Sequence, residues 1–327
     1  MSVIPAGAMR FNSDSQKLEY WNGSAWFQVH TATPNLNGGA RGLFGNGATP
    51  TAVNTIDYIN ISSTGNATDF GDNTRTGIGI AACASSTRGL FLGGGGSVTN
   101  TIDFITISST GNAADYGDLV SSTYFSRGCS NSTRGIVAGG YSPATPTASN
   151  IIQYVTIASL GNGVDFGDLT RGVTSCGACS SSTRGIFGGG YSSSTPFQNI
   201  IDFITISTLG NAFDFGDLTQ ARRNMTALSN PTRGIFALGE APGNVNTIDF
   251  ITISTIGNAT DFGDTVTAAQ CNSSCSSSTR GVFGGYEPIS NTLEYITILT
   301  QGNAVDFGDL TQARTNCAGL SNAHGGL

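Results

Sequence analysis

Positive charge, histidine and long apolar runs are all scarce in this sequence. Lysine occurs once, at Lys17, there are two histidines, and acidic residues outnumber basic ones, giving a formal net charge of −7. Surfaces that bind nucleic acid or acidic membranes need clustered cations, so we expect neither partner. No apolar run approaches about 18 residues and the first residues lack a basic then apolar pattern, so we expect no membrane span and no signal peptide.

Patterns for catalysis and cofactor binding are also lacking. His30 and His324 lie in no motif with a candidate nucleophile. Gly93–Gly96 precedes a strand-like segment and not a helix, so it is not a phosphate-binding loop. We therefore expect no enzyme, no cofactor and no catalytic residues.

Cysteine is used in a way that argues against disulfides and metal. The seven cysteines are an odd number, and four of them lie five residues before a repeated arginine: Cys83, Cys129, Cys179 and Cys275. A shared repeat position predicts small buried thiols. Cys176 and Cys179 form a lone C-x-x-C without a second pair, so we expect no zinc site.

What the sequence does contain is one segment that recurs six times. The copies begin at Arg41, Arg88, Arg134, Arg184, Arg233 and Arg280. From the Asn that opens the TIDFITIS-like segment to the first Asp of DFGD (DYGD in the second copy), the distance is 15 residues in every copy, as from Asn246 to Asp261. Only the interval from the arginine to that Asn varies, between 11 and 16 residues. Variation is therefore confined to one loop per repeat.

Each repeat offers four candidate strands: a run of small residues, an RGIF-like run, the TIDFITIS segment and the short NATDFGD segment. In the third, Ile248 and Phe250 point to one face while Ile251 and Ile253 point to the other. A sheet that is apolar on both faces must be covered on both, as blades of a propeller are. A period near 47 residues fits the same architecture. We predict an all-β, six-bladed propeller with four-stranded blades.

The order of these features resembles the Kelch repeat over residues 39–327. A strand ending in Gly-Gly is followed by a variable loop, an aromatic-containing strand, a short fourth strand and an arginine. The Phe or Tyr of DFGD stands where Kelch repeats carry a tryptophan near the fourth strand. The resemblance implies a propeller fold and, as one option, a protein-interaction adaptor.

The ends of the repeat region predict how the ring closes. The first repeat enters at its second strand, Arg41 to Gly45, and Ala318 to His324 is an innermost strand with no repeat after it. Pairing the two would complete six blades and remove the open sheet edges at the seam.

Residues 1–38 lie outside the repeats and form a predicted docking or oligomerisation segment with a linker at Thr31 to Gly39. AMRFNSD, KLEYWNG and AWFQV are predicted as short strands, with Asn22-Gly23 as a hairpin turn and a looser turn at Asn12 to Asp14. A unit this small is marginally stable alone, so its aromatics should pack on the repeat domain or on another subunit. The docking candidates are Phe11, Tyr20, Trp21, Trp26 and Phe27.

RFNSDS, KLEYWNG and AW, within Gly7 to Val29, resemble a short motif of tailed-bacteriophage virion proteins, especially fibre-like and appendage proteins. The resemblance implies an attachment or oligomerisation tag before a distal domain. It also implies other virion subunits as partners, a homo-oligomer, and a location in the virion after assembly in the host cytoplasm.

The variable loops are the candidate recognition elements, because loops on a rigid scaffold commonly carry binding. Their aromatic residues are the ligand-binding candidates: Tyr141, Tyr191, Phe197 and Tyr286. Aromatic rings among Ser, Thr and Asn suit sugar rings, which predicts a host-surface glycan or protein receptor as ligand. The alternative is that these loops are merely unconstrained.

The recurring aspartates of DFGD have a structural and a calcium-binding interpretation. We favour the structural one, in which they cap turns and pair with the recurring arginines, or the arginines bind carbonyls. Three functions remain open: a phage tail-fibre or appendage protein that displays loops to a host surface, a purely structural decoration or connector protein, and a Kelch-like adaptor.

Overall fold

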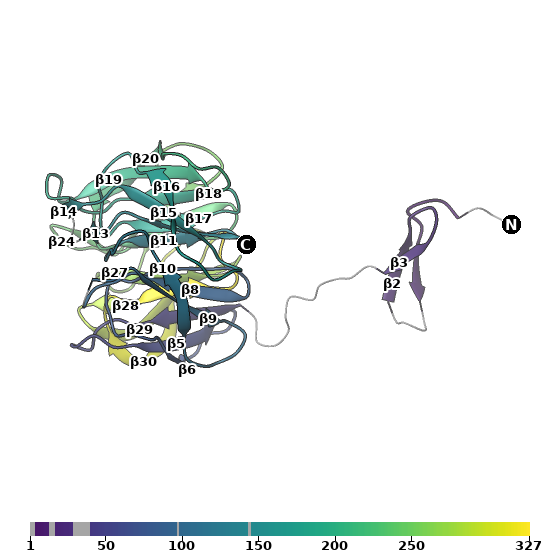
Figure 1. Ribbon diagram of the computed structural model, residues 1–327, viewed down its shortest axis with the longest axis horizontal. Coiled ribbons are helices and arrows are strands. Elements are labelled where there is room, and N and C mark those ends of the chain that lie inside the picture. Colours follow the sequence, from purple (N-terminus) through teal and green to yellow (C-terminus); the bar gives the residue numbers. More distant parts are fainter. Residues whose placement is uncertain (1–3, 13–16, 29–39, 97, 143–144) are drawn as a thin grey trace. The chain divides into compact units, whose positions relative to one another are not determined.

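The computed structural model describes residues 4–12, 17–28, 40–96, 98–142 and 145–327. The chain divides into a unit spanning Met1–Gly39 and a unit spanning Ala40–Leu327. Every regular element in these described ranges is a strand, and four-stranded antiparallel sheets dominate the second unit (Figure 1). The predicted all-β class is confirmed, and the arrangement is propeller-like. The predicted linker Thr31–Gly39, His30 and turn residues 13–14 lie outside the described ranges.

The first unit is a three-stranded antiparallel sheet in the order β1 (Met9–Asn12), β2 (Lys17–Trp21) and β3 (Trp26–Gln28). These are the three strands that the sequence predicts. Asn22 forms the predicted turn, because its Oδ1 accepts hydrogen bonds from the backbone N–H groups of Ser24 and Ala25, both at 2.8 Å.

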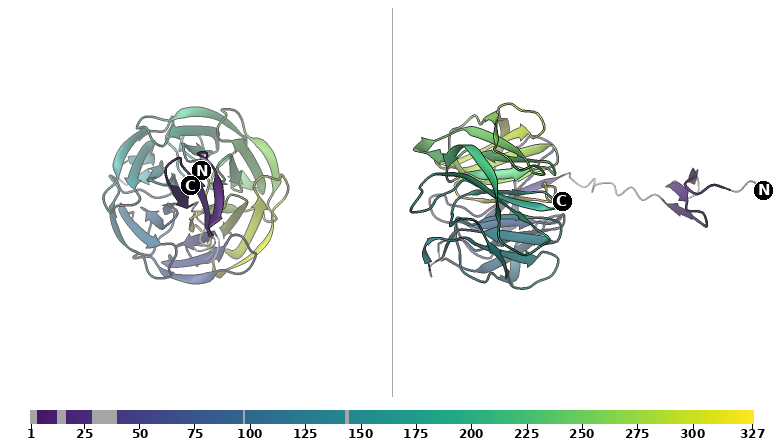
Figure 2. Two further views of the ribbon diagram at one scale, coloured as in Figure 1. Left: turned by 90° about the vertical axis from the view of Figure 1, so that its right-hand side faces the viewer. Right: turned by 90° about the horizontal axis from the view of Figure 1, so that it is seen from above.

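The second unit repeats one antiparallel four-stranded sheet, and in one of these sheets the first strand, β31, comes from the end of the chain. Written from the strand of small residues outward, its four-stranded sheets are β31 (Ala318–Ser321), β4 (Arg41–Gly45), β5 (Thr55–Asn60) and β6 (Thr68–Asp72); β7 (Ala81–Ala84), β8 (Arg88–Leu92), β9 (Thr101–Thr106) and β10 (Ala114–Asp118); β11 (Arg127–Ser130), β12 (Arg134–Ala138), β15 (Ile151–Thr156) and β16 (Val164–Asp168); β17 (Gly177–Ser180), β18 (Arg184–Gly188), β19 (Gln198–Thr205) and β20 (Phe213–Arg222); β21 (Thr226–Ser229), β22 (Arg233–Ala237), β25 (Thr247–Thr252) and β26 (Thr260–Asp264); and β27 (Gln270–Ser276), β28 (Arg280–Glu287), β29 (Ser290–Thr297) and β30 (Val305–Arg314). Two short hairpins, β13 (Tyr141–Ser142) with β14 (Thr145–Ala148) and β23 (Glu240–Ala241) with β24 (Gly243–Asn244), extend from two of the sheets. Figure 2 shows the sheets disposed around a common centre.

The strands of small residues lie against one another around that centre. Five of the six end in a serine whose hydroxyl donates to a carbonyl of the preceding sheet, as Ser180 does to Ser130 at 2.7 Å and Ser321 to Ser276 at 2.6 Å. Ala84 takes the serine position in β7. Glycine or another small residue is needed here, because a Cβ on Gly319 would strike the Ser274 backbone. Small side chains in these strands are thus a consequence of crowding.

The third strands are buried on both faces. Ile248 packs with Phe283 and Ile296 of the next sheet, whereas Ile251 packs with Ile186 and Ile201 of the preceding one. Burying each large aliphatic side chain contributes about 1.5–3 kcal/mol, so neighbouring sheets stabilise one another. The predicted two-sided burial is confirmed.

A clamp between neighbouring sheets explains the DFGD and GN motifs. The Asn of each GN accepts a hydrogen bond at 3.0–3.1 Å from the backbone N–H of the second DFGD aspartate in the preceding repeat, as Asn211 does from Asp168. The glycine of DFGD has a positive φ, and a Cβ at Gly167 would lie 2.5 Å from the carbonyl oxygen of Gly210. The close approach therefore requires glycine.

The predicted pairing of DFGD aspartates with arginines is wrong. None of the ion pairs in the described ranges uses a DFGD aspartate. The arginines that open each repeat instead stack on the aromatic residue of their own third strand and donate to a carbonyl of the next sheet. Arg88, for example, lies 4.7 Å from the Phe104 ring centroid and donates to Ile157 O at 3.0 Å. The carbonyl alternative is therefore confirmed for this set.

The predicted pairing between the last strand and the first repeat is present. β31 pairs with β4 from Ala318↔Gly45 to Ser321↔Gly42, and Asn322 Oδ1 accepts a bond from Arg41 N at 2.8 Å. Residues 324–326 then turn toward the centre, where His324 Nε2 donates to Ala84 O at 2.8 Å and Gly325 N donates to Ser229 O at 3.0 Å. This terminal segment contacts sheets that are distant in sequence.

Candidate recognition face

The variable loops connect the second and third strands of each sheet and share one end of the sheets with the connections from fourth strands to the next repeat. They are residues 46–54, 93–100, 139–150, 189–197, 238–246 and 288–289. Backbone bridges tie each connection to a variable loop, as in Tyr124↔Tyr141, Thr174↔Tyr191 and Arg223↔Glu240. This end of the second unit is the candidate recognition face.

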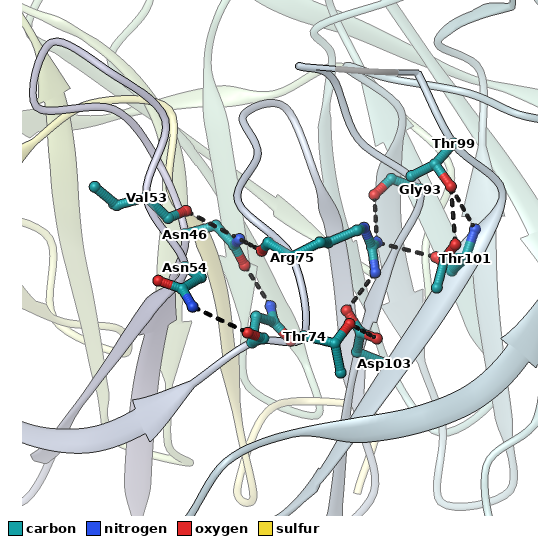
Figure 3. Close-up of polar contacts among 10 residues, drawn as sticks. Asn46, Val53, Asn54, Thr74, Arg75, Gly93, Thr99, Thr101 and Asp103 are labelled. Atoms are coloured by element: carbon teal, nitrogen blue, oxygen red, sulfur yellow. Dashed lines mark hydrogen bonds and ion pairs between the residues drawn. The ribbon is translucent and has the colours of Figure 1, made fainter.

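An arginine from the preceding repeat holds the base of the loop at 93–100 (Figure 3). Arg75 Nη2 donates to Gly93 O at 2.6 Å on one side of the loop and to Thr101 O at 3.0 Å on the other. Its Nη1 forms an ion pair with Asp103, which also accepts a 2.6 Å bond from the Thr74 hydroxyl. One guanidinium therefore fixes both ends of the loop, and Asp103 balances its charge.

The segment that carries Arg75 is also hydrogen-bonded to the loop at residues 46–54. Asn46 Nδ2 donates to Val53 O at 3.2 Å and to Arg75 O at 2.8 Å, as Figure 3 shows. Burial lowers the pKa of Arg75 and raises that of Asp103, and the attraction between the two groups opposes both shifts. Both groups are engaged with each other and with the loop, so the pair supports the loops and is not a free binding group.

Three further joints repeat this design, where a joint is the contact between the third residue of a TIDF-like segment and the residues that follow the DFGD motif of the preceding repeat. The ion pairs of these joints are Arg171–Asp202 at 2.7 Å, Arg222–Asp249 at 3.1 Å and Arg314–Asp57 at 2.8 Å. In each, a threonine hydroxyl also donates to the aspartate: Thr170, Thr219 and Thr311. The arginines expected to pair with aspartate do so, but with the aspartate of TIDF.

Two joints lack both the threonine and the arginine. Val120 and Val266 occupy the threonine position, and the aspartate is replaced by Gln153 and Glu294. Gln153 Oε1 accepts from Val120 N at 2.7 Å, and Glu294 accepts from Val266 N at 2.9 Å and Thr267 N at 3.1 Å. The longer side chains thus reach backbone donors directly.

Three predicted ligand-binding aromatics come together on the recognition face. Arg223 lies 5.1 Å from the Tyr191 ring centroid and 5.2 Å from that of Phe197, and burial together with the neighbouring Tyr191 raises the pKa of the Tyr141 hydroxyl. Tyr141 is also 5.5 Å from the ring of Tyr124. All three predicted residues are half-buried, so one edge of each is held while another meets solvent. They form a single aromatic row across neighbouring loops.

Tyr286 does not belong to this row, which corrects the prediction. It lies in β28, pairs with Cys271 and is 1% exposed, packed in the core with Leu238 and Ala269. The loop of the sixth repeat is so short that its flanking strands continue through the Tyr position. Tyr286 therefore cannot act as a surface platform.

Sequence reasoning missed Tyr124, Arg223 and Glu240 on this face. Arg223 Nε donates to Glu240 Oε2 at 2.9 Å, and its Nη2 donates to Oε1 at 3.1 Å. That bidentate pair holds the guanidinium beside the rings of Tyr191 and Phe197. The sequence feature that could have identified Arg223 is the adjacent pair Arg222-Arg223. Arg222 forms the ion pair of a joint, and Arg223 lies at the surface.

A pocket of about 380 Å³ lies beside Phe197 on the recognition face. Its walls come from the end of β14, the segment at Arg171-Gly172 and the serine-rich loop Ser192–Thr195. A smaller space of about 80 Å³ lies among the strands of small residues, where His324 is found. Burial lowers the pKa of His324, and its bond to Ala84 O opposes that shift, so the imidazole is neutral at neutral pH.

The predicted docking residues divide between the two faces of the first unit. Phe11, Tyr20 and Phe27 are exposed on one face, together with Met9 and Leu18. Trp21 and Trp26 pack against each other on the other face, at 5.5 Å between ring centroids. There Arg10 lies 4.2 Å from the Trp26 ring and pairs with the buried Glu19 at 2.8 Å. The tryptophan face is thus internally satisfied, whereas the other face is an exposed apolar surface.

No protein-family model matches the chain, and no curated protein matches it significantly. Within the described ranges, no cluster of His, Cys, Asp or Glu could hold a metal ion, and no helix could cross a membrane. The cysteines whose side chains are described are free and buried: Cys83, Cys129, Cys176, Cys179, Cys275 and Cys317. Burial raises the pKa of the Cys83 and Cys179 thiols to about 12. These thiols are packing groups, as their repeat position predicts.

Proposed function

We propose that the protein is a tailed-bacteriophage virion component, an appendage or fibre-like protein that recognises a host surface. In this proposal the first unit attaches the protein to the particle. The second unit is a six-bladed propeller whose ring is closed by β31, and it presents the recognition face. The pairing of β31 with β4 supports the closed ring.

One observation carries the recognition role. Tyr141 comes from one variable loop and Tyr191 and Phe197 from the next, yet the three form one row, and the base of the loop carrying Tyr191 and Phe197 is fixed by the half-buried Arg171. A binding surface gains affinity when its loops are held in the bound conformation beforehand. Scaffold stability alone does not require half-exposed aromatics on loops of varying length.

The attachment role is supported by the first unit. A sheet this small has five apolar side chains exposed on one face, Met9, Phe11, Leu18, Tyr20 and Phe27. Contiguous apolar patches of this kind mark interaction surfaces. Together with the RFNSDS and KLEYWNG motifs, this face favours a docking tag for other virion subunits.

Two full-chain variants separate the roles experimentally. The fluorescently labelled protein is expected to adsorb to the phage's host bacterium and to slow infection, and Tyr191→Ala with Phe197→Ala should abolish both effects. Phe11→Ser with Phe27→Ser should leave adsorption intact but prevent incorporation into particles, as measured by mass spectrometry of purified virions. Incorporation without any adsorption would favour a purely structural decoration or connector protein. Absence from particles would overturn the virion proposal.

A further inference from the structure

The pocket beside Phe197 combines a neutral floor, a hydroxyl-rich wall and one aromatic ring. It lies between the variable loops of the third and fourth repeats. We propose that this pocket binds a single neutral pyranose unit, so that it is the specificity subsite of the recognition face. The proposal rests on the proposed function for its biological meaning, and on the lining residues for its chemistry.

Arg171, which we call the floor of the pocket, is not available to bind acidic ligands. Among the described lining residues, Arg171 is the one charged side chain. Its Nη1 is paired with Asp202 at 2.7 Å, its Nη2 donates to Gly189 O at 3.0 Å and Ile200 O at 2.7 Å, and its Nε donates to Gln198. A phosphate, sulfate or carboxylate would need a cation that is free to bind it. The guanidinium is already engaged, so the preferred ligand is uncharged.

The wall of the pocket offers preformed hydroxyl groups. Ser192, Ser193, Ser194 and Thr195 line it from one loop, and Thr147 lines it from the opposite side. The loop is held by its own bonds, since Ser192 N donates to Thr195 O at 3.1 Å, Thr195 N donates back at 3.2 Å, and the Ser192 and Ser194 hydroxyls lie 3.2 Å apart. A hydroxyl both donates and accepts, which matches the alternating needs of sugar hydroxyls.

Phe197 supplies the apolar surface that a sugar ring also needs. Its ring lines the pocket and is backed by Arg223 at 5.2 Å from the ring centroid, so its orientation is fixed. A pyranose has an apolar C–H face and a polar rim, and an aromatic ring beside hydroxyls complements both. The volume, about 380 Å³, lies at the lower end of small-ligand sites and fits one sugar unit better than an extended peptide.

The test uses saturation-transfer difference NMR on the full chain with four probes. These are the methyl glycosides of glucose, galactose and N-acetylglucosamine as neutral sugars, and glucuronic acid as the anionic one. We expect saturation of at least one neutral probe, a loss of at least fivefold in Phe197→Ala, and no saturation of glucuronic acid. Phe213→Ala is the matched control, because Phe213 is an exposed phenylalanine on the fourth strand of the same sheet, outside the pocket lining.

Two outcomes would overturn the pocket assignment. One is saturation of none of the neutral probes, and the other is equal saturation in Phe197→Ala and wild type. Preferential binding of glucuronic acid would contradict the neutral floor. Adsorption to host cells that survives Phe197→Ala would leave the virion proposal standing while removing this pocket from it, so the two failures are distinguishable.

Discussion

The four joints that use arginine differ instructively from the two that do not. Wherever threonine and arginine follow the DFGD motif, the next repeat supplies aspartate, and wherever valine stands in place of the threonine, the next repeat supplies Gln153 or Glu294. A short carboxylate suffices when the partner side chains reach it, but a longer one is needed to reach the backbone. The joint therefore behaves as a unit of three positions: the threonine or valine, the arginine, and the third residue of the TIDF-like segment. The residue at each position depends on the residues at the other two.

The largest effect is expected from Asp249→Ala. Arg222 and Asp249 have fully buried side chains, so removing the carboxylate leaves a guanidinium charge without its counterion. We expect a loss of about 3–5 kcal/mol in the free energy of unfolding, measured by urea denaturation. Asp214→Ala is the control, since Asp214 is an exposed DFGD aspartate outside every described ion pair. A loss below about 1 kcal/mol for Asp249→Ala would contradict the joint.

Gln153→Asp should cost less, about 1–3 kcal/mol, because it shortens the side chain and buries a carboxylate beside Val120. Converting the joint fully, by adding Val120→Thr and Ser121→Arg, should recover most of that loss. The midpoint of urea unfolding reports both steps. If the triple variant were no more stable than the single one, the three positions would not act together.

Thr219→Val introduces the valine found in two other joints into a joint that keeps its aspartate, Asp249. It removes the 2.6 Å hydrogen bond from Thr219 Oγ1 to Asp249, which should cost about 1 kcal/mol. The melting temperature should fall correspondingly, whereas Thr260→Val on the exposed start of β26 should leave it unchanged. Equal melting temperatures for both variants would show that the hydroxyl is dispensable.

The smallest effect, and the one that depends on pH, is expected at Glu294. Burial raises the pKa of Glu294 above its ordinary 4.5, although its bonds from Thr267 and Val266 oppose the shift. The folded state therefore binds the proton more tightly than the unfolded state. The stability of wild type relative to Glu294→Gln should be highest below pH 4.5 and should fall as pH rises through the folded pKa. Urea titrations near pH 4 and near pH 7 measure this, and a difference independent of pH would contradict it.

The repeated elements of this fold were readable from the sequence, because constant spacing and two-sided apolar strands leave few architectures. The partners of the aspartates were not readable. Asp103 of a TIDF segment and Asp115 of a DFGD-type segment both recur, in four and in six repeats, and only the packing of neighbouring sheets brings Arg75 to the former. Residue counts show that aspartate and arginine recur with the repeat, but they do not show which of these residues form ion pairs.

The recognition face was predicted in part for a similar reason. Tyr141, Tyr191 and Tyr286 each follow a Gly-Gly pair, so the sequence pattern treats them alike, although Tyr286 stands six residues after its opening arginine and the other two stand seven. Their exposure is set by loop length: a long loop ends its strands early, whereas the shortest loop lets β28 run on through Tyr286. Arg223 was missed because its role depends on Arg222, which turns inward to Asp249.

The entry of the chain into the second unit bears on how the molecule would carry load. A pull on the first unit would reach the sheets at Ala40 and pass at once to β4, which is held on one side by β5 and on the other by β31. The paired bonds between Arg41 and Asn322 lie at this point of entry. Tension would thus be shared with the far end of the same chain before any sheet could peel away. The connection between the two units therefore resists detachment for as long as β31 remains paired with β4.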